Sequence, residues 1–134
     1  MRTGSHRHSV VWLDHFEAVV MHVHPDVAET VRFSSEREAE DRQVHRKSGV
    51  PGSGHAADDV AFFSRIAGAL TESEVIVVSG PGLAKRSFVS YLRRRYADLA
   101  QRVVAVETLD HPSEGELERY AKTYFKRLQA LGTL

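Results

Sequence analysis

The residues with the clearest capacity for chemistry lie in two glycine-rich turns. The first, residues 49–55, reads Gly-Val-Pro-Gly-Ser-Gly-His and follows the basic residues Arg46 and Lys47. The second, residues 80–82, reads Gly-Pro-Gly and precedes Lys85. A glycine turn that opens a helix leaves backbone N–H groups free, and these favour an anion. Both turns are candidates for ligand contact, and the second is a candidate anion site.

The second turn does not match the phosphate loop of nucleotide hydrolases. The G-x-x-x-x-G-K-[ST] spacing would require glycine at position 84, where alanine stands. The pattern therefore argues against an NTPase. A structural role remains open, in which Gly80 and Gly82 only let a strand turn tightly into a helix.

The strongest charge asymmetry lies between residues 83 and 102. The chain has 18 basic and 18 acidic residues and no formal net charge, but this segment holds six basic residues and one acidic residue. At about 100° per residue, the apolar stripe of the expected helix leaves Arg86, Arg93 and Arg94 on its outer side. Such a face suits the phosphate backbone of nucleic acids. An ordinary solvated helix face is the alternative.

Eight histidines and no cysteine limit the metal and redox chemistry of the chain. Without cysteine there is no disulfide, zinc ribbon, iron–sulfur site or cysteine nucleophile. His22 and His24 share one face of an expected strand, but a metal would need further ligands from Asp14, His15 or His111, which the spacing does not bring together. We therefore expect half-exposed histidines, no bound metal, no cofactor and no catalytic residue.

Hydrophobic periodicity predicts the element order βββαβαβα. Parallel neighbours need helical crossovers, so this order indicates an α/β fold of three layers, with a mixed five-stranded sheet and helices on both faces. A site is expected where parallel strands end, at loops 79–82 and 109–113. Strands are expected as a hairpin within 10–23 and at 29–33, 74–78 and 103–106, and helices over 58–70, 83–102 and 111–128.

Length and composition favour one domain over residues 1–134, ordered from about residue 8 to about residue 129, with a mobile glycine loop at 48–56. The longest aliphatic runs, 75–78 and 103–106, have four residues each, against about 20 for a membrane span. The polar start of the chain has no signal-like core. A cytoplasmic protein that does not enter membranes is expected.

Residues 45–59 and 75–92 together resemble the middle domain of eukaryotic and archaeal class I release factors and of Pelota. In that family a strand runs into Gly-Pro-Gly and then into a helix with an early lysine and a following aromatic residue. The matching residues are Val75–Val78, Gly80–Gly82, Lys85 and Phe88. The resemblance covers about residues 10–128 and implies a ribonuclease H-like fold in the translational machinery.

The release factors carry Gly-Gly-Gln in the loop before the first helix, and its glutamine promotes hydrolysis of peptidyl-tRNA. The matching loop here has Gly52-Ser53-Gly54, and Gln43 lies upstream of the glycines. Peptide release is therefore not implied, and the chain is more similar to Pelota, which also lacks the motif. The resemblance implies noncatalytic binding to the ribosome or structured RNA. The expected contacts are Lys85, Arg86, Arg93, Arg94, Arg46, Lys47 and His55, with the loop glycines and serine Gly49, Gly52, Ser53 and Gly54 and the anion-binding turn of Gly80 and Gly82.

Two other classes of function stay open. A metal-dependent nuclease or hydrolase of the ribonuclease H type would use Asp14, Glu107, Asp110 and a nearby histidine, although Asp14 falls at a turn rather than within a strand. A protein-interaction module is the other class. An open sheet edge at the hairpin would allow a homodimer, and a separate partner protein is also conceivable.

Overall fold

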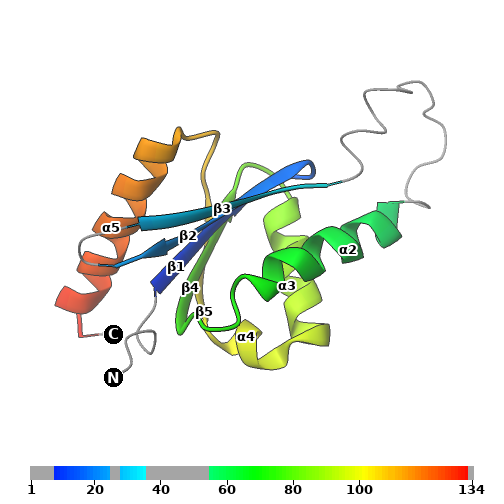
Figure 1. Cartoon of the computed structure of the whole chain (residues 1–134). Coiled ribbons are helices and arrows are strands. Elements are labelled where there is room, and N and C mark those ends of the chain that lie inside the picture. The colour runs from blue at the N-terminus through cyan, green and yellow to red at the C-terminus, as the bar shows by residue number, and fades with distance from the viewer. Residues whose placement is uncertain (1–7, 25–27, 36–54, 133–134) are drawn as a thin grey trace.

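The computed structural model describes residues 8–24, 28–35 and 55–132, with the side chains of 55–58 left aside. Within these ranges the predicted order βββαβαβα is confirmed, with one helix divided in two (Figure 1). The strands are β1 (His8–Leu13), β2 (Glu17–Val23), β3 (Ala28–Ser34), β4 (Val75–Gly80) and β5 (Val103–Thr108). The helices are α2 (His55–Gly68), α3 (Ala84–Arg95), α4 (Ala97–Gln101) and α5 (Glu114–Ala130).

The strands form one mixed sheet in the order β3-β2-β1-β4-β5. The β1–β2 and β2–β3 pairs are antiparallel, and β4 is parallel to both β1 and β5. Val11 is paired with Val20 on one side and Val78 on the other. The expectation of an open edge at the hairpin is therefore wrong, because β3 and β4 flank β1 and β2. In the part of the chain that is described, the open edges belong to β3 and β5.

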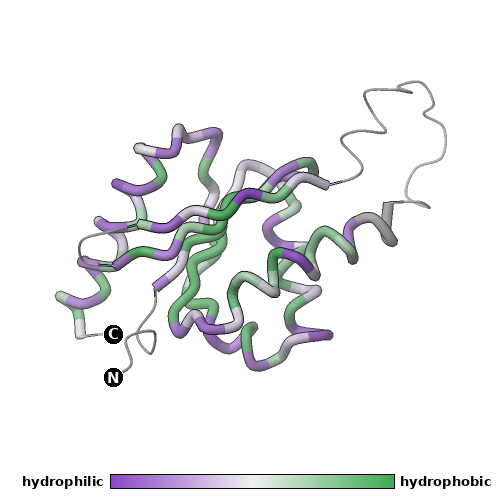
Figure 2. The backbone as a smooth tube through the Cα atoms, viewed as in Figure 1, coloured by the Kyte–Doolittle hydropathy of each residue, from purple (hydrophilic) through white to green (hydrophobic). Residues whose placement is uncertain are grey.

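Helices cover both faces of the sheet, as predicted, but unequally. Helices α2, α3 and α4 share one face, and α5 is the only described helix on the other (Figure 1). Phe62 and Phe88 are fully buried in the first core, and Phe125 anchors α5 in the second. Figure 2 shows hydrophobic residues concentrated in the strands between these two layers. No helix of the described residues is both long and apolar enough to cross a membrane.

The single helix expected over 83–102 is broken at Tyr96. This residue leaves helical geometry, with φ −142° and ψ 66°, and separates α3 from α4. The segment contains neither glycine nor proline here, so packing imposes the break. The Tyr96 ring contacts the Tyr91 ring at 5.8 Å, and Leu99 of α4 is buried in the first core. Tyr96 itself is 37% exposed.

Candidate nucleic-acid interface

Helix α3 presents a basic outer face. Its 12 residues include Lys85, Arg86 and three consecutive arginines at the end, and no acidic residue. Arg86, Arg93, Arg94 and Arg95 are exposed, and none of them forms an ion pair with a described residue. The arginines of the last turn lie where the helix dipole favours positive charge. Acidic side chains of the described residues therefore leave these four arginines unpaired.

The inner side of α3 fixes this orientation. Phe88, Val89 and Leu92 are buried in the first core, and the Phe88 ring lies 5.4 Å from the ring of Phe63 in α2. Residues three and four apart share one side of a helix, so burying this stripe turns Arg86 and Arg93 outward. The structure places Arg86, Arg93 and Arg94 on the solvent side, as the helical period predicts.

Lys85 does not lie on that exposed face, and its predicted contact with RNA stays a prediction. The side chain is only 3% exposed, and its Nζ donates a hydrogen bond to the Gly82 carbonyl. The side chain of Lys85 is packed at the first turn of α3, and its ammonium group bonds to the carbonyl of the residue three positions earlier. A ligand in solvent would reach this group only after that hydrogen bond broke.

The two glycines of the β4–α3 turn differ in their structural demands. Gly80 has φ +154°, and a Cβ added there would lie 2.1 Å from the carbonyl oxygen of Leu13. A Cβ at Gly82 would meet no atom within 4 Å. Close packing on β1 thus accounts for Gly80 without any ligand. The anion-binding role of Gly80 and Gly82 stays a prediction.

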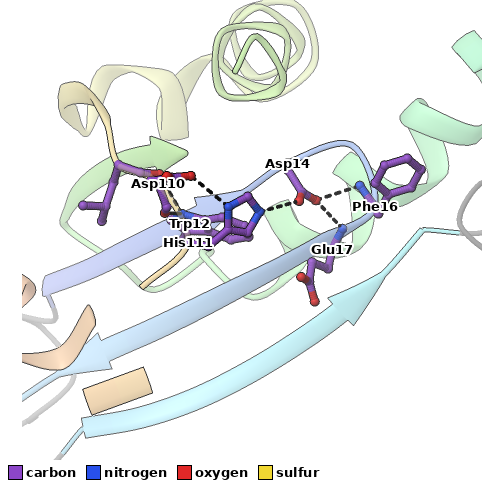
Figure 3. Close-up of polar contacts among 7 residues, drawn as sticks. Trp12, Asp14, Phe16, Glu17, Asp110 and His111 are labelled. Carbon is purple, nitrogen blue, oxygen red and sulfur yellow. Dashed lines mark hydrogen bonds and ion pairs between the residues drawn. The ribbon is translucent and has the colours of Figure 1, made fainter. Parts of the chain in front are cut away.

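The carboxyl ends of β1 and β5 bring together three titratable side chains that the spacing did not connect (Figure 3). The His111 Nδ1 lies 2.9 Å from Asp110 Oδ1, and its Nε2 lies 3.4 Å from Asp14 Oδ2. Asp14 Oδ1 accepts the backbone N–H groups of Phe16 at 2.8 Å and Glu17 at 2.9 Å. Asp14 therefore organises the hairpin turn while its second oxygen faces His111.

Trp12 anchors the same corner. Its Nε1 donates to the carbonyl oxygens of Leu109, at 3.0 Å, and Asp110, at 2.7 Å. The indole also meets the His111 ring edge-on, with centroids 5.0 Å apart (Figure 3). Residues 8–13 and 109–111 are thus tied by side-chain contacts. Sequence reasoning missed Trp12, although a lone tryptophan at the end of a buried strand was a signal that could have indicated it.

The nuclease alternative gains no metal site from this cluster. Among the described residues no group of three or more histidine and acidic side chains could hold a metal ion. Glu107, which that alternative required, instead accepts a hydrogen bond from the Tyr124 hydroxyl at 3.2 Å.

His22, expected to be half-exposed, is buried, and its Nδ1 lies 2.7 Å from Ser9 Oγ.

The His111 contacts predict a pH-dependent contribution to stability. The hydrogen bond that the His111 ring donates to the Asp110 carboxylate, with a further contribution from Asp14, raises the pKa of His111 above 6.5. A raised folded-state pKa gives stability that is fully present below pH 6.5 and is lost as pH rises through the folded-state pKa. The His111→Asn variant should therefore lose more stability at pH 5.5 than at pH 9, measured by urea unfolding.

The exposed His15 of the same hairpin turn supplies the control for this experiment. His15 forms no ion pair with a described residue. The His15→Asn variant makes the same substitution in the same turn without removing a contact to Asp110 or Asp14. An equal loss at both pH values for His111→Asn would contradict the role given to its carboxylate neighbours.

The predicted loop contacts cannot be placed on this surface. Helix α2 begins at His55, and the remaining loop positions lie outside the described ranges. These positions are Arg46, Lys47, Gly49, Gly52, Ser53 and Gly54, together with the side chain of His55.

The comparisons with known proteins point in one direction. No protein-family model matches the chain. Its sequence is 34% identical over 59 residues to the protein pelota homolog of Archaeoglobus fulgidus, a stretch that is 42% of this chain and 17% of that protein.

Solved structures of the same group share the fold. The Pelota protein of Thermoplasma acidophilum aligns with a TM-score of 0.60 and 21% identity over 88% of this chain and 32% of that one. The archaeal translation termination factor aRF1 aligns with a TM-score of 0.54 and 15% identity over 95% and 42% of the two chains. The translation termination-like factor Dom34 of S. cerevisiae, involved in RNA quality control pathways and interacting with Hbs1, aligns with 0.56 and 13% over 93% and 35%.

The chain thus spans 32–42% of the length of these solved relatives. The likeness nevertheless extends over about nine-tenths of this chain, through both the hairpin and the crossover helices. The resemblance predicted from the Gly-Pro-Gly turn and its flanking elements is confirmed, and the chain has the fold of a Pelota- and release-factor-like domain.

Proposed function

We propose that this protein acts in translation by binding the ribosome or structured RNA through the outer face of α3, without catalysing a reaction. The observation that carries the proposal is the exposed arginine face of a helix without acidic residues. The similarity to translation termination-like factors supports the setting. A role on the ribosome would place the protein in the cytoplasm.

The spacing of the arginines suits contact with a phosphate backbone. Arg86 and Arg93 are seven residues apart, which returns them to the same side of the helix about 10 Å apart along its axis. Arg94, the next residue along the chain, lies about 100° further around the helix and so widens the basic face. Guanidinium groups bind phosphate oxygens with two parallel hydrogen bonds, so each arginine can hold a separate phosphate. The loop with Arg46, Lys47 and His55 would add contacts of the same kind.

The noncatalytic part of the proposal follows from the loop sequence. The stretch Gly52-Ser53-Gly54 has no glutamine beside its glycines. The amide side chain that promotes peptide release in the release factors has no counterpart at these positions. Binding, rather than peptidyl-tRNA hydrolysis, is therefore the function the chain is best equipped for.

Ribosome cosedimentation tests this function. At low salt the native chain should sediment with ribosomes, and the bound fraction should fall steeply as salt increases, because phosphate contacts release counterions. The double variant Arg93→Glu and Arg94→Glu should weaken binding by about 10- to 100-fold, since two attractive contacts become repulsive. Both side chains are exposed, so the variant should fold normally.

A matched control distinguishes the loss of this arginine face from a mere change in net charge. The double variant Arg119→Glu and Arg127→Glu changes the net charge equally but lies on α5, on the opposite face of the sheet. It should sediment like the native chain. Absence of a ribosome-bound fraction at low salt, or equal loss in both double variants, would overturn the proposal.

A further inference from the structure

The outer side of α5 carries a second surface that the proposed function does not use. Because α5 is the only described helix on its face of the sheet, the side of α5 that looks toward β5 has no helical neighbour (Figure 1). A hollow lies on that side of the helix. It is lined by Glu116, Arg119, Tyr120, Thr123, Tyr124 and Arg127.

Two tyrosines connect the hollow to β5. The rings of Tyr120 and Tyr124 lie 5.8 Å apart, and the Tyr124 hydroxyl donates to Glu107 of β5 at 3.2 Å. The Tyr120 hydroxyl oxygen is buried and has no hydrogen-bond partner among the described residues. Burial, with the Glu107 charge adding, raises the pKa of Tyr120 to about 12, so this group keeps its proton. It is a donor without an acceptor.

The lining of the hollow carries one more positive than negative charge: Glu116 is acidic, and Arg119 and Arg127 are basic. The Glu116 carboxylate accepts the Ser113 N–H at 2.8 Å in the capping box of α5. Arg119 and Arg127 are exposed and form no ion pair with a described residue. The two arginines can therefore pair with acidic groups of a ligand.

The neighbouring strand edge has little protection against pairing. Among the described strands, β5 is paired with β4 on one side only, and its sequence Val-Val-Ala-Val-Glu-Thr contains one charge, Glu107, and neither lysine nor proline. Val104 is 45% exposed. The opposite edge strand, β3, carries two charges, Glu29 and Arg32, of the kind that discourage pairing. The β5 edge offers unpaired backbone donors and acceptors to an extended polypeptide.

We propose that the β5 edge and the α5 hollow together bind an acidic extended segment of a protein partner, which adds a sixth strand to the sheet. Arg119 and Arg127 are eight residues apart, about 12 Å along the helix axis. Acidic residues four apart on an extended chain share one face and are separated by about 13 Å, which matches that distance. Backbone pairing favours a polypeptide over RNA, whose backbone cannot continue the strand ladder.

A designed peptide tests this site directly. The probe is a fluorescein-labelled peptide of alternating threonine and valine, nine residues long, with glutamate at its third and seventh positions. Its control has lysine at both positions. The glutamate peptide should bind the full chain with at least tenfold higher affinity than the lysine peptide, by fluorescence anisotropy. Backbone amide shifts in ¹⁵N spectra should concentrate in residues 103–108 and 116–127.

Two disruptive variants and one control variant make the test specific. The double variant Arg119→Glu with Arg127→Glu should weaken glutamate-peptide binding at least tenfold. The variant Val104→Lys should have the same effect, because a lysine on an edge strand discourages strand pairing. Arg93→Glu with Arg94→Glu, with the same change of net charge, should leave it unchanged. These sites are exposed, and an unchanged melting temperature would verify folding.

Four results would overturn the proposal. These are equal affinity for the two peptides, amide shifts outside β5 and α5, tighter binding of a uridine nonamer than of the glutamate peptide at the same residues, and a dimer in sedimentation whose β5 amides are already protected. Ribosome binding through α3 could survive any of these results, so the two proposals fail independently.

Discussion

Replacing Gly80 with alanine should lower the free energy of unfolding by about 3 kcal/mol or more, because strain and overlap act together. At φ +154° an L side chain is strained, and the added Cβ would lie 2.1 Å from the backbone carbonyl oxygen of Leu13. This oxygen belongs to the central strand β1, so it cannot move aside without disturbing the β1–β4 pairing. Urea unfolding followed by circular dichroism measures the loss.

Gly82 provides the matched control, two residues away in the same turn. A Cβ there meets no atom within 4 Å, and the residue does not have a positive φ. The Gly82→Ala variant should stay within about 1 kcal/mol of the native chain, since alanine mainly restricts the unfolded state. Equal stability of the two variants would contradict the close approach of β4 to β1.

The same turn shows what the sequence could and could not predict. Alternating and helical periodicities predicted the element order, because each element buries one continuous apolar side. The motif Gly80-Pro81-Gly82 predicted the position of the turn and was one of the features that carried the family resemblance. The reason for Gly80 could not be predicted, because its constraint is the Leu13 carbonyl, 67 positions earlier in the chain. Such constraints are tertiary and leave no local pattern.

The residues of the candidate surfaces also divide into those whose positions the sequence predicted and those whose positions it did not. Exposure of Arg86 and Arg93 follows from the helical period and was predicted. Burial of Lys85 was not, because a long side chain can fold back to a carbonyl of its own turn. In α5 the buried centre is formed by Ala121 and Phe125, each one position beyond a tyrosine. This placement leaves Tyr120 and Tyr124 at the rim of the hollow.

A buried polar chain at the other end of the sheet should be the second most sensitive point of the fold. The Ser9 Oγ lies 2.7 Å from both His22 Nδ1 and Ser73 Oγ. Ser9 and Ser73 are fully buried, and His22 is 5% exposed. Ser9 and His22 are directly paired between β1 and β2, and Ser73 lies just before β4. One hydroxyl thus joins three segments of the chain.

The Ser9→Ala variant should lower the free energy of unfolding by about 2–4 kcal/mol. It removes the shared partner of two buried polar groups: leaving the Ser73 hydroxyl without that partner costs about 1–3 kcal/mol, and losing the hydrogen bond to His22 costs about 1 kcal/mol more. Urea unfolding at pH 7.5 measures the effect. Ser87→Ala, at an exposed position of α3, should stay within about 0.5 kcal/mol of the native chain.

A double variant distinguishes the polar chain from simple loss of packing. Once Ser9 is alanine, the Ser73 hydroxyl is a buried group without that partner, so replacing Ser73 with alanine as well removes a penalty. The double variant should therefore lose less stability than the sum of the two single variants. Additive losses would contradict the shared hydrogen bonding, because non-interacting sites contribute independently. Sub-additive losses would show that the two serines stabilise the β1–β2–β4 junction as a unit.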